Sequence, residues 1–129
     1  MFNSKTANIM KTDLVEIFQT IRAGLQPYAS RGYTVHENSE TGYDLYSEKN
    51  IEIGGEKITE RFFAGIYINN DQVEVKVNVT DFETSRQNLV SFGNDQAGLN
   101  IKELGDSKLK EIETLIEIIH TNFKEKEWI

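Results

Sequence analysis

The stretch from 61 to 80 reads RFFAGIYINNDQVEVKVNVT and predicts a β-hairpin. Asn70 and Asp71 separate two runs of alternating residues, and both residue types tolerate the positive φ that a tight hairpin turn needs. A turn centred on this pair sets four cross-strand pairs: Ile68 faces Val73, Ile66 faces Val75, Ala64 faces Val77 and Phe62 faces Val79. One face of the hairpin is then wholly apolar, as expected of strands that are buried on one side.

The glycine pair Gly54-Gly55 predicts a second hairpin. A turn centred there gives a register of five pairs: Glu52 with Lys57, Ile51 with Ile58, Glu48 with Arg61, Tyr46 with Phe63 and Leu45 with Ala64. This register puts Leu45 on the apolar face already assigned, so the two turns agree. Together they predict a four-stranded antiparallel meander at 33–37, 43–53, 56–68 and 73–80, with a possible fifth strand at 99–101.

Amphipathic helices are expected before and after these strands. The first apolar stripe predicts a helix over 9–30, in which Pro27 kinks the chain or begins a separate last turn; it consists of Leu14, Ile17, Phe18, Ile21 and Leu25. The second predicts a C-terminal helix from Asp106 or Ser107; it consists of Leu109, Ile112, Leu115, Ile116, Ile119 and Phe123. Thr80 and Glu83 have the spacing of a capping box and predict a short helix that ends near Gly93.

These elements indicate a single α+β domain over residues 1–129, with flexible ends at 1–8 and 124–129. We expect an antiparallel sheet of four strands, or of five with 99–101, with the N-terminal and C-terminal helices packed on one face. A chain of 129 residues can bury a core without disulfide or metal staples. The absence of cysteine excludes disulfides, thiolate zinc sites and cysteine nucleophiles.

Charge and hydropathy limit the classes of partner. Fourteen basic and 21 acidic residues give a net charge of −7, and the basic residues are scattered among the acidic ones. We therefore expect no nucleic-acid partner, because an acidic chain without a basic patch repels a polyanion. No segment approaches the roughly 20 apolar residues of a membrane span, and residues 1–11 lack the apolar region of a signal peptide. The expectation is a soluble, cytoplasmic protein with no membrane partner.

The sheet face away from the helices is the candidate binding surface. It is expected to display three aromatic residues among polar ones: Tyr46, Phe63 and Tyr67, with His36, Asp44, Arg61 and Lys76 around them. An aromatic cluster with a charged rim is typical of an interaction surface and predicts a protein partner or self-association as a homodimer. In the alternative, residues 93–105 fold over these rings and form a second small core.

Two other functions stay open. A pocket between the sheet and the helices could bind a small apolar or aromatic ligand. Alternatively, Asp44 could orient His36 as the general base of a small enzyme, if Val35 pairs with Leu45. The sequence has no common catalytic or phosphate-binding motif, so a non-enzymatic adaptor without cofactor or metal is the leading interpretation. With two histidines and no cysteine, a carboxylate-rich site for a hard cation is the remaining metal option.

The order helix, antiparallel meander, helix in a small acidic chain resembles two known architectures, the frataxin-like fold and the secretion-chaperone fold. Both resemblances concern element order. Frataxins imply an acidic ridge on the first helix, where this chain offers Asp13 and Glu16. Secretion chaperones place a helix within the strand series, whereas this chain has four expected strands in succession. No functional residue is transferred from either family.

Overall fold

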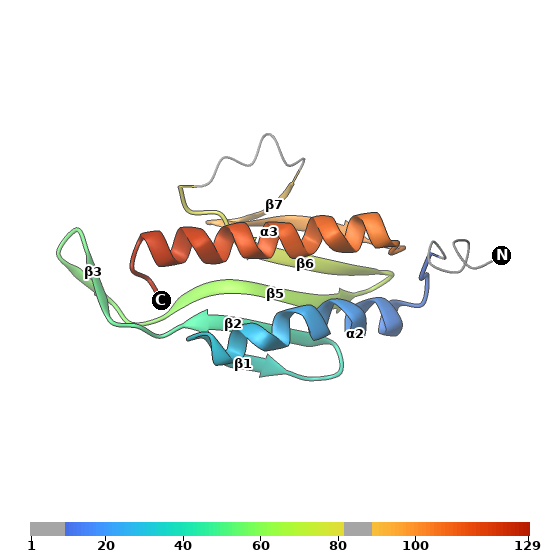
Figure 1. Ribbon diagram of the computed structural model, residues 1–129, viewed down its shortest axis with the longest axis horizontal. Helices are drawn as coiled ribbons and strands as arrows, with labels where there is room; N and C mark the ends of the chain where they lie inside the picture. Colours follow the sequence, from blue (N-terminus) through green and yellow to red (C-terminus); the bar gives the residue numbers. More distant parts are fainter. Residues whose placement is uncertain (1–9, 82–88) are drawn as a thin grey trace.

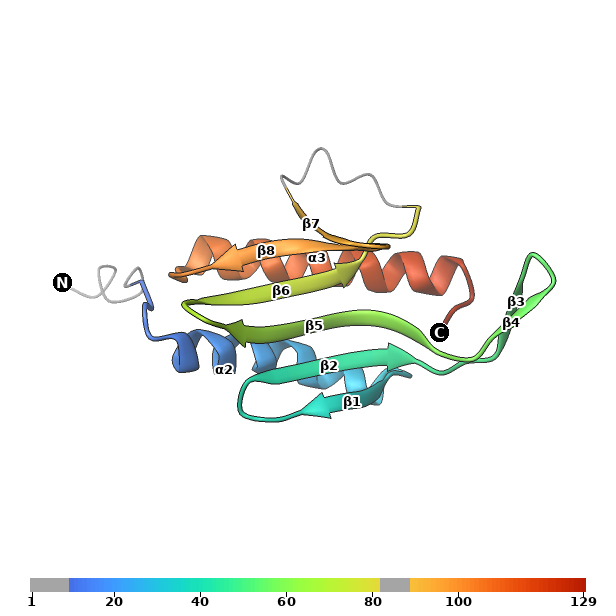
Figure 2. The same cartoon turned by 180° about the vertical axis from the view of Figure 1, so that it is seen from behind.

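A computed structural model describes residues 10–81 and 89–129, which form an α+β domain with one sheet layer and one helix layer (Figure 1). In this part of the chain, six antiparallel strands form the main sheet in the order β1-β2-β5-β6-β8-β7. They are β1 (Thr34–Asn38), β2 (Gly42–Ser47), β5 (Arg61–Asn69), β6 (Gln72–Asn78), β7 (Val90–Gly93) and β8 (Gln96–Ile101). A smaller sheet, β3 (Ile51–Ile53) with β4 (Glu56–Ile58), projects beyond one end of the main sheet (Figure 2).

The main sheet is larger than the expected four or five strands. The neighbours β1, β2, β5 and β6 confirm the predicted meander. The chain leaves the main sheet after β2, forms the β3-β4 hairpin and returns to the sheet at β5. In that hairpin Ile51 pairs with Ile58 and Glu52 with Lys57, as predicted. The hairpin of β7 and β8 then extends the sheet, with β8 beside β6 and β7 at the edge.

The first expected helix, predicted over 9–30, is shorter in the structure and spans the length of its apolar stripe. Helix α2 (Leu14–Leu25) begins after Asp13, whose carboxylate accepts hydrogen bonds from the backbone N–H groups of Val15 and Glu16. A separate 3-10 turn, η1 (Gln26–Ser30), follows, because Pro27 cannot continue the α-helical hydrogen bonds. The second expected helix is α3 (Asp106–Glu125), and both helices lie on the same face of the main sheet (Figure 1).

The core lies between these helices and the inner face of the sheet. Its most deeply buried members come from both layers: Ile17, Phe18, Ile21, Leu25, Ile112, Ile119 and Phe123 from the helices, and Leu45, Ala64, Ile66, Val73, Val75 and Val77 from the strands. The predicted pairs Ala64 with Val77, Ile66 with Val75 and Ile68 with Val73 are confirmed. The covered apolar face is therefore the one that the hairpin pattern indicated.

A β-bulge in β5 reverses the expected positions of Phe62 and Phe63. Leu45 pairs with Ala64 as predicted, but the next residue of β2, Tyr46, pairs with Phe62 instead of Phe63. Phe63 is the extra residue of the bulge, and the side-chain alternation shifts by one from that point. Phe62 consequently lies on the outer face of the sheet, and its expected pairing with Val79 is absent from the β5-β6 ladder.

The same shift moves Phe63 and Arg61 to the helix side. Phe63 is fully buried, and its ring stacks on Tyr33 with the ring centroids 3.9 Å apart. Arg61 is 8% exposed, and its guanidinium carbon lies 4.6 Å from the ring centroid of Trp128. The expected pairs of Tyr46 with Phe63 and of Glu48 with Arg61 are therefore wrong.

Two further expectations concern the segment after β6 and the chain ends. Most of the short helix predicted after Thr80 lies outside the described residues, but its expected end near Gly93 is wrong because 90–93 form β7. The expected flexibility of 1–8 also lies outside them, and that of 124–129 stays a prediction; Trp128 is 8% exposed. Neither helix in the described ranges has the length and apolar content needed to cross a membrane.

Candidate interaction face

The outer face of the main sheet, opposite α2 and α3, is uncovered by the described elements. Figure 2 looks onto this face, and the described helices lie behind the strands in that view. Strand β8 lies within the sheet beside β6, so residues 96–101 enlarge the face and do not cover it. The alternative in which 93–105 fold over the aromatic residues is therefore wrong. We call this surface the open sheet face.

Four aromatic side chains gather on the open sheet face: Tyr46, Phe62, Tyr67 and Phe92. Tyr46 packs edge-on against Phe62 with the ring centroids 5.5 Å apart. Tyr67 and Phe92 flank Lys76, whose Nζ lies 5.2 Å and 4.8 Å from their ring centroids. Tyr46, Tyr67 and Phe92 are partly exposed, so the face presents rings as well as charge to a partner.

Two glycines lie in the middle of this face, and one of them leaves room for a ring. Gly65, Lys76 and Gly98 are cross-strand neighbours in one row. A Cβ atom at Gly65 would lie 2.5 Å from the hydroxyl oxygen of Tyr67, and one at Gly98 would lie 1.6 Å from the carbonyl oxygen of Val75. The missing side chain at Gly65 lets the Tyr67 ring lie across β5, whereas the one at Gly98 lets the backbone of β8 approach that of β6.

Tyr67 is anchored to Asp44. Its hydroxyl donates a hydrogen bond of 2.8 Å to one carboxylate oxygen of Asp44, and the other oxygen accepts one of 2.7 Å from the backbone N–H of Glu37. Burial, reinforced by Asp44, raises the pKa of Tyr67 above its ordinary value, so the phenol remains a donor at neutral pH. Asp44, which is 7% exposed, therefore fixes the position of an aromatic ring.

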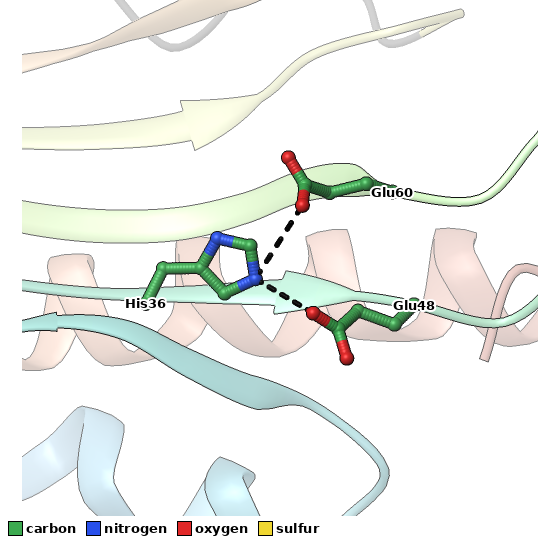
Figure 3. A group of neighbouring side chains, drawn as sticks. All are labelled: His36, Glu48 and Glu60. Atoms are coloured by element: carbon green, nitrogen blue, oxygen red, sulfur yellow. Dashed lines mark hydrogen bonds and ion pairs between the residues drawn. The ribbon is translucent and has the colours of Figure 1, made fainter.

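His36 lies with Glu48 and Glu60 at the edge of the open sheet face (Figure 3). Its ring stacks on Tyr46, with the centroids 4.0 Å apart and 11° between the planes. Its Nε2 atom is 2.9 Å from a carboxylate oxygen of Glu48 and 3.8 Å from one of Glu60. The expected pairing of His36 with Asp44 is wrong, although Val35 does pair with Leu45, because the register of β1 shifts just after that pair.

Among the described residues, carboxylates outnumber cations on this face. Lys76 lies 3.6 Å from Glu74, which also accepts a hydrogen bond from Asn69. The acidic residues of the face are Glu37, Asp44, Glu48, Glu60 and Glu74, whereas Lys76 and His36 are the basic ones. The net charge of these residues is therefore negative, as is that of the whole chain, which is −7.

The enclosed space between the two helices is small. Its volume is about 40 Å³, and its lining is mostly apolar: Ile21, Gly24, Tyr28, Leu109, Ile112, Glu113 and Ile116. Pockets for drug-sized ligands begin at about 300 Å³. This cavity has room for a few atoms only.

The structure brings together most of the residues expected at the binding surface. Tyr46, Tyr67, His36, Asp44 and Lys76 lie on the open sheet face, whereas Phe63 and Arg61 lie on the helix side. The sequence pattern missed Phe62, which the bulge turns outward, and Phe92, which lies in a segment read as the end of a helix. Comparison of the chain with protein-family models, curated proteins and solved structures finds no match.

Proposed function

We propose that this chain is a non-enzymatic protein-interaction domain whose open sheet face binds a basic segment of a partner protein. The observation that carries the proposal is the uncovered cluster of Tyr46, Tyr67 and Phe92 within an excess of carboxylates. Aromatic residues contribute much of the binding energy at protein interfaces. Charge complementarity then selects the partner.

A segment rich in arginine or lysine suits this face better than a second copy of the chain. Two copies would bring carboxylate-rich faces together, and like charges in contact oppose association. An arginine side chain, by contrast, can stack on a partly exposed ring such as Tyr46 or Phe92 and pair with the exposed carboxylates of Glu48 and Glu60. A homodimer through this face is one outcome that the test distinguishes.

The two alternative functions have weaker support in the described structure. An enzyme built on His36 and Asp44 would need Asp44 to orient the imidazole, yet Asp44 binds Tyr67 and His36 contacts Glu48. The space between α2 and α3 has a volume of only about 40 Å³. A larger hollow of about 510 Å³ lies between α2 and the turn after β1, but most of its lining is polar, which does not suit an apolar or aromatic ligand: Gln19, Arg22, Asn38, Ser39 and Glu40, with Val15 and Phe18. The role of a protein-interaction domain is therefore the best supported of the three.

The test measures binding of the full chain to an array of 15-residue peptides that differ in net charge and arginine content. Peptides that bind are then titrated into isotope-labelled protein, and the perturbed backbone amides are mapped by NMR. We expect basic peptides to bind, acidic peptides not to bind, and the affinity to fall as salt is added. The perturbed amides should lie in β2, β5, β6 and β7.

Matched variants locate the binding surface. Phe92→Ser and Tyr46→Ser are expected to weaken peptide binding by about tenfold or more, as for residues near the centre of an interface. Val15→Ser removes an apolar side chain that is 52% exposed on α2, outside the open sheet face, and should leave the affinity unchanged. Equal binding by all three variants would contradict the proposal. If sedimentation equilibrium shows a dimer that Tyr46→Ser dissociates, the partner of the open sheet face is a second copy of this chain and not a basic segment.

A further inference from the structure

Three potential metal ligands converge at one end of the open sheet face (Figure 3). His36 comes from β1, Glu48 follows β2 directly, and Glu60 immediately precedes β5. One nitrogen of His36 and one oxygen of each carboxylate all lie within 4.8 Å of one another. Antiparallel pairing of β1, β2 and β5 brings together side chains that are 12 to 24 positions apart in the sequence.

Neighbouring residues already orient two of the three ligands. The stacked ring of Tyr46 holds the imidazole of His36 in a plane from which Nε2 points toward the carboxylates. The hydroxyl of Thr34 donates a hydrogen bond of 3.2 Å to Oε1 of Glu48, while Oε2 of Glu48 faces the imidazole. Such outer contacts fix the direction of metal-binding side chains and contribute to metal affinity.

The local charge favours a cation. His36 lies between two carboxylates, and within residues 10–81 and 89–129 neither Glu48 nor Glu60 forms an ion pair with a lysine or arginine. The cluster also belongs to a face and a chain that are acidic overall. A bound divalent ion would offset both carboxylates at once, whereas the imidazole offsets at most one of them.

We propose that His36, Glu48 and Glu60 form a binding site for a single divalent transition-metal ion of the zinc class. An imidazole ligand favours zinc and its neighbours over magnesium and calcium, which bind oxygen atoms. Zinc about 2 Å from each ligand in a tetrahedron requires ligand atoms roughly 3.3 Å apart. The observed separations from Nε2, 2.9 Å to Glu48 and 3.8 Å to Glu60, bracket that value.

The fourth position of such an ion would face solvent. All three ligand residues are at the surface, with side-chain exposures of 27% for His36, 49% for Glu48 and 56% for Glu60. Three protein ligands and one open position are the arrangement of zinc sites that bind an exchangeable water or an external group. This inference does not depend on the proposed function, because metal binding is measured without any partner. A bound ion would compete with a partner's arginine for Glu48 and Glu60, so the two would occupy these carboxylates in turn.

The test titrates Zn²⁺ into the tag-free full chain by isothermal calorimetry, after dialysis against a chelator. Three variants accompany the wild type: His36→Asn, Glu60→Gln and Glu56→Gln. Glu56 is an exposed carboxylate on β4 outside the cluster, so Glu56→Gln makes the same change in charge as Glu60→Gln. Circular dichroism checks that each variant is folded, and NMR follows the imidazole resonances of His36 and His120 during the titration.

We expect one Zn²⁺ per chain in the wild type and in Glu56→Gln, with no competition from Mg²⁺. His36→Asn and Glu60→Gln should each weaken binding by about tenfold or more, at least as much as loss of an outer contact does. The resonances of His36 should shift, and those of His120 should not. Absence of saturable binding in the wild type, or equal affinity in His36→Asn, would overturn the proposal.

Discussion

Gly65 allows the ring of Tyr67 to lie across the open sheet face. Gly65→Ala should lower the free energy of unfolding by about 1–3 kcal/mol, because the new Cβ would displace the Tyr67 hydroxyl and leave the buried Asp44 with one donor fewer. The ordinary preference of a strand for alanine over glycine works in the opposite direction but contributes only about 0.5–1 kcal/mol. Urea unfolding monitored by circular dichroism measures the difference.

A double-mutant cycle with Tyr67→Phe separates the hydrogen bond from other effects. Tyr67→Phe removes the hydroxyl, which is the atom nearest to the new Cβ, and leaves the contacts with Cβ of Asp44 at 2.8 Å and Cζ of residue 67 at 2.9 Å. Both single changes lose the same hydrogen bond, so the two together should cost less than their sum. If the two changes in unfolding free energy are strictly additive, Gly65→Ala destabilises the protein by a mechanism other than loss of the Tyr67 hydrogen bond.

Arg61 is a buried cation with little compensation. Its Nη1 and Nη2 atoms are buried and have no hydrogen-bond partner among the described residues, and burial lowers its pKa. The ring of Trp128 contributes up to about 2 kcal/mol, whereas a buried charge without partners costs several kcal/mol. Arg61→Met keeps the contact with Trp128 and should raise the free energy of unfolding by about 1 kcal/mol.

Urea unfolding tests this prediction, with Arg31→Met as the control. Arg31 forms an exposed ion pair with Glu117, so its replacement should change stability by less than about 1 kcal/mol. A large loss of stability in Arg61→Met would show that the guanidinium has a stabilising partner in solution.

At the scale of elements, His120 joins α3 to the segment that precedes β1. It is 3% exposed, and its Nδ1 lies 2.8 Å from the hydroxyl oxygen of Tyr33. Burial lowers the pKa of His120; Arg31 and Lys124 act in the same direction, and Glu117 acts against them. The unfolded chain therefore binds a proton at a higher pH than the folded chain does.

Because of this difference, stability should fall as the pH drops below about 6.5, by up to about 1.4 kcal/mol per pH unit, until the folded protein also takes up the proton. His120→Gln should remove this slope while leaving an amide in reach of Tyr33. The pKa of Glu117 is lowered, chiefly by its hydrogen bond from Tyr28, so Glu117 acts only at lower pH, below its ordinary value of 4.5. Unfolding free energies measured from pH 7.5 to 5 in both proteins test the assignment. An unchanged slope in His120→Gln would refute it.

The elements that the sequence predicted well are those with long, regular periodicity. The stripes of α2 and α3 and the valine alternation in β6 each repeat several times. The Asn70 and Gly54-Gly55 turns set registers that the structure reproduces in the pairs near each turn and loses at the bulge in β5. These repeats reflect burial on one side, which is a property of each element alone. The layer arrangement follows from them.

The errors arose where geometry depends on a neighbouring strand. The bulge at Phe63 has no signature in the alternation of β5, because phenylalanine stands at both 62 and 63 and either one suits the core. Strands β7 and β8 are short and contain glycine, and their pairing depends on contact with β6. The sequence thus predicted aromatic residues on the outer face of the sheet, but only the structure identified Phe62 and Phe92 among them.

At the scale of the whole molecule, the two layers divide the apolar and charged residues. Both helices cover one face of the main sheet (Figures 1 and 2), and the other face carries the aromatic rings, the carboxylates and His36. Trp128, near the C-terminus, packs on the helix side of the main sheet. Trp128 packs edge-on against Phe123, and its carbonyl oxygen accepts a hydrogen bond from the hydroxyl of Ser47 in β2.

Trp128 should therefore be one of the most important residues for stability, although it stands next to the end of the chain. Trp128→Ala is expected to lower the free energy of unfolding by about 3 kcal/mol, because it removes a large side chain that is 8% exposed and packs against Phe123. Glu125→Ala, an exposed change three residues earlier, should be nearly neutral. Urea unfolding compares the two variants. If Trp128→Ala is also neutral, the last residues are flexible in solution, and the end of the core is closed without them.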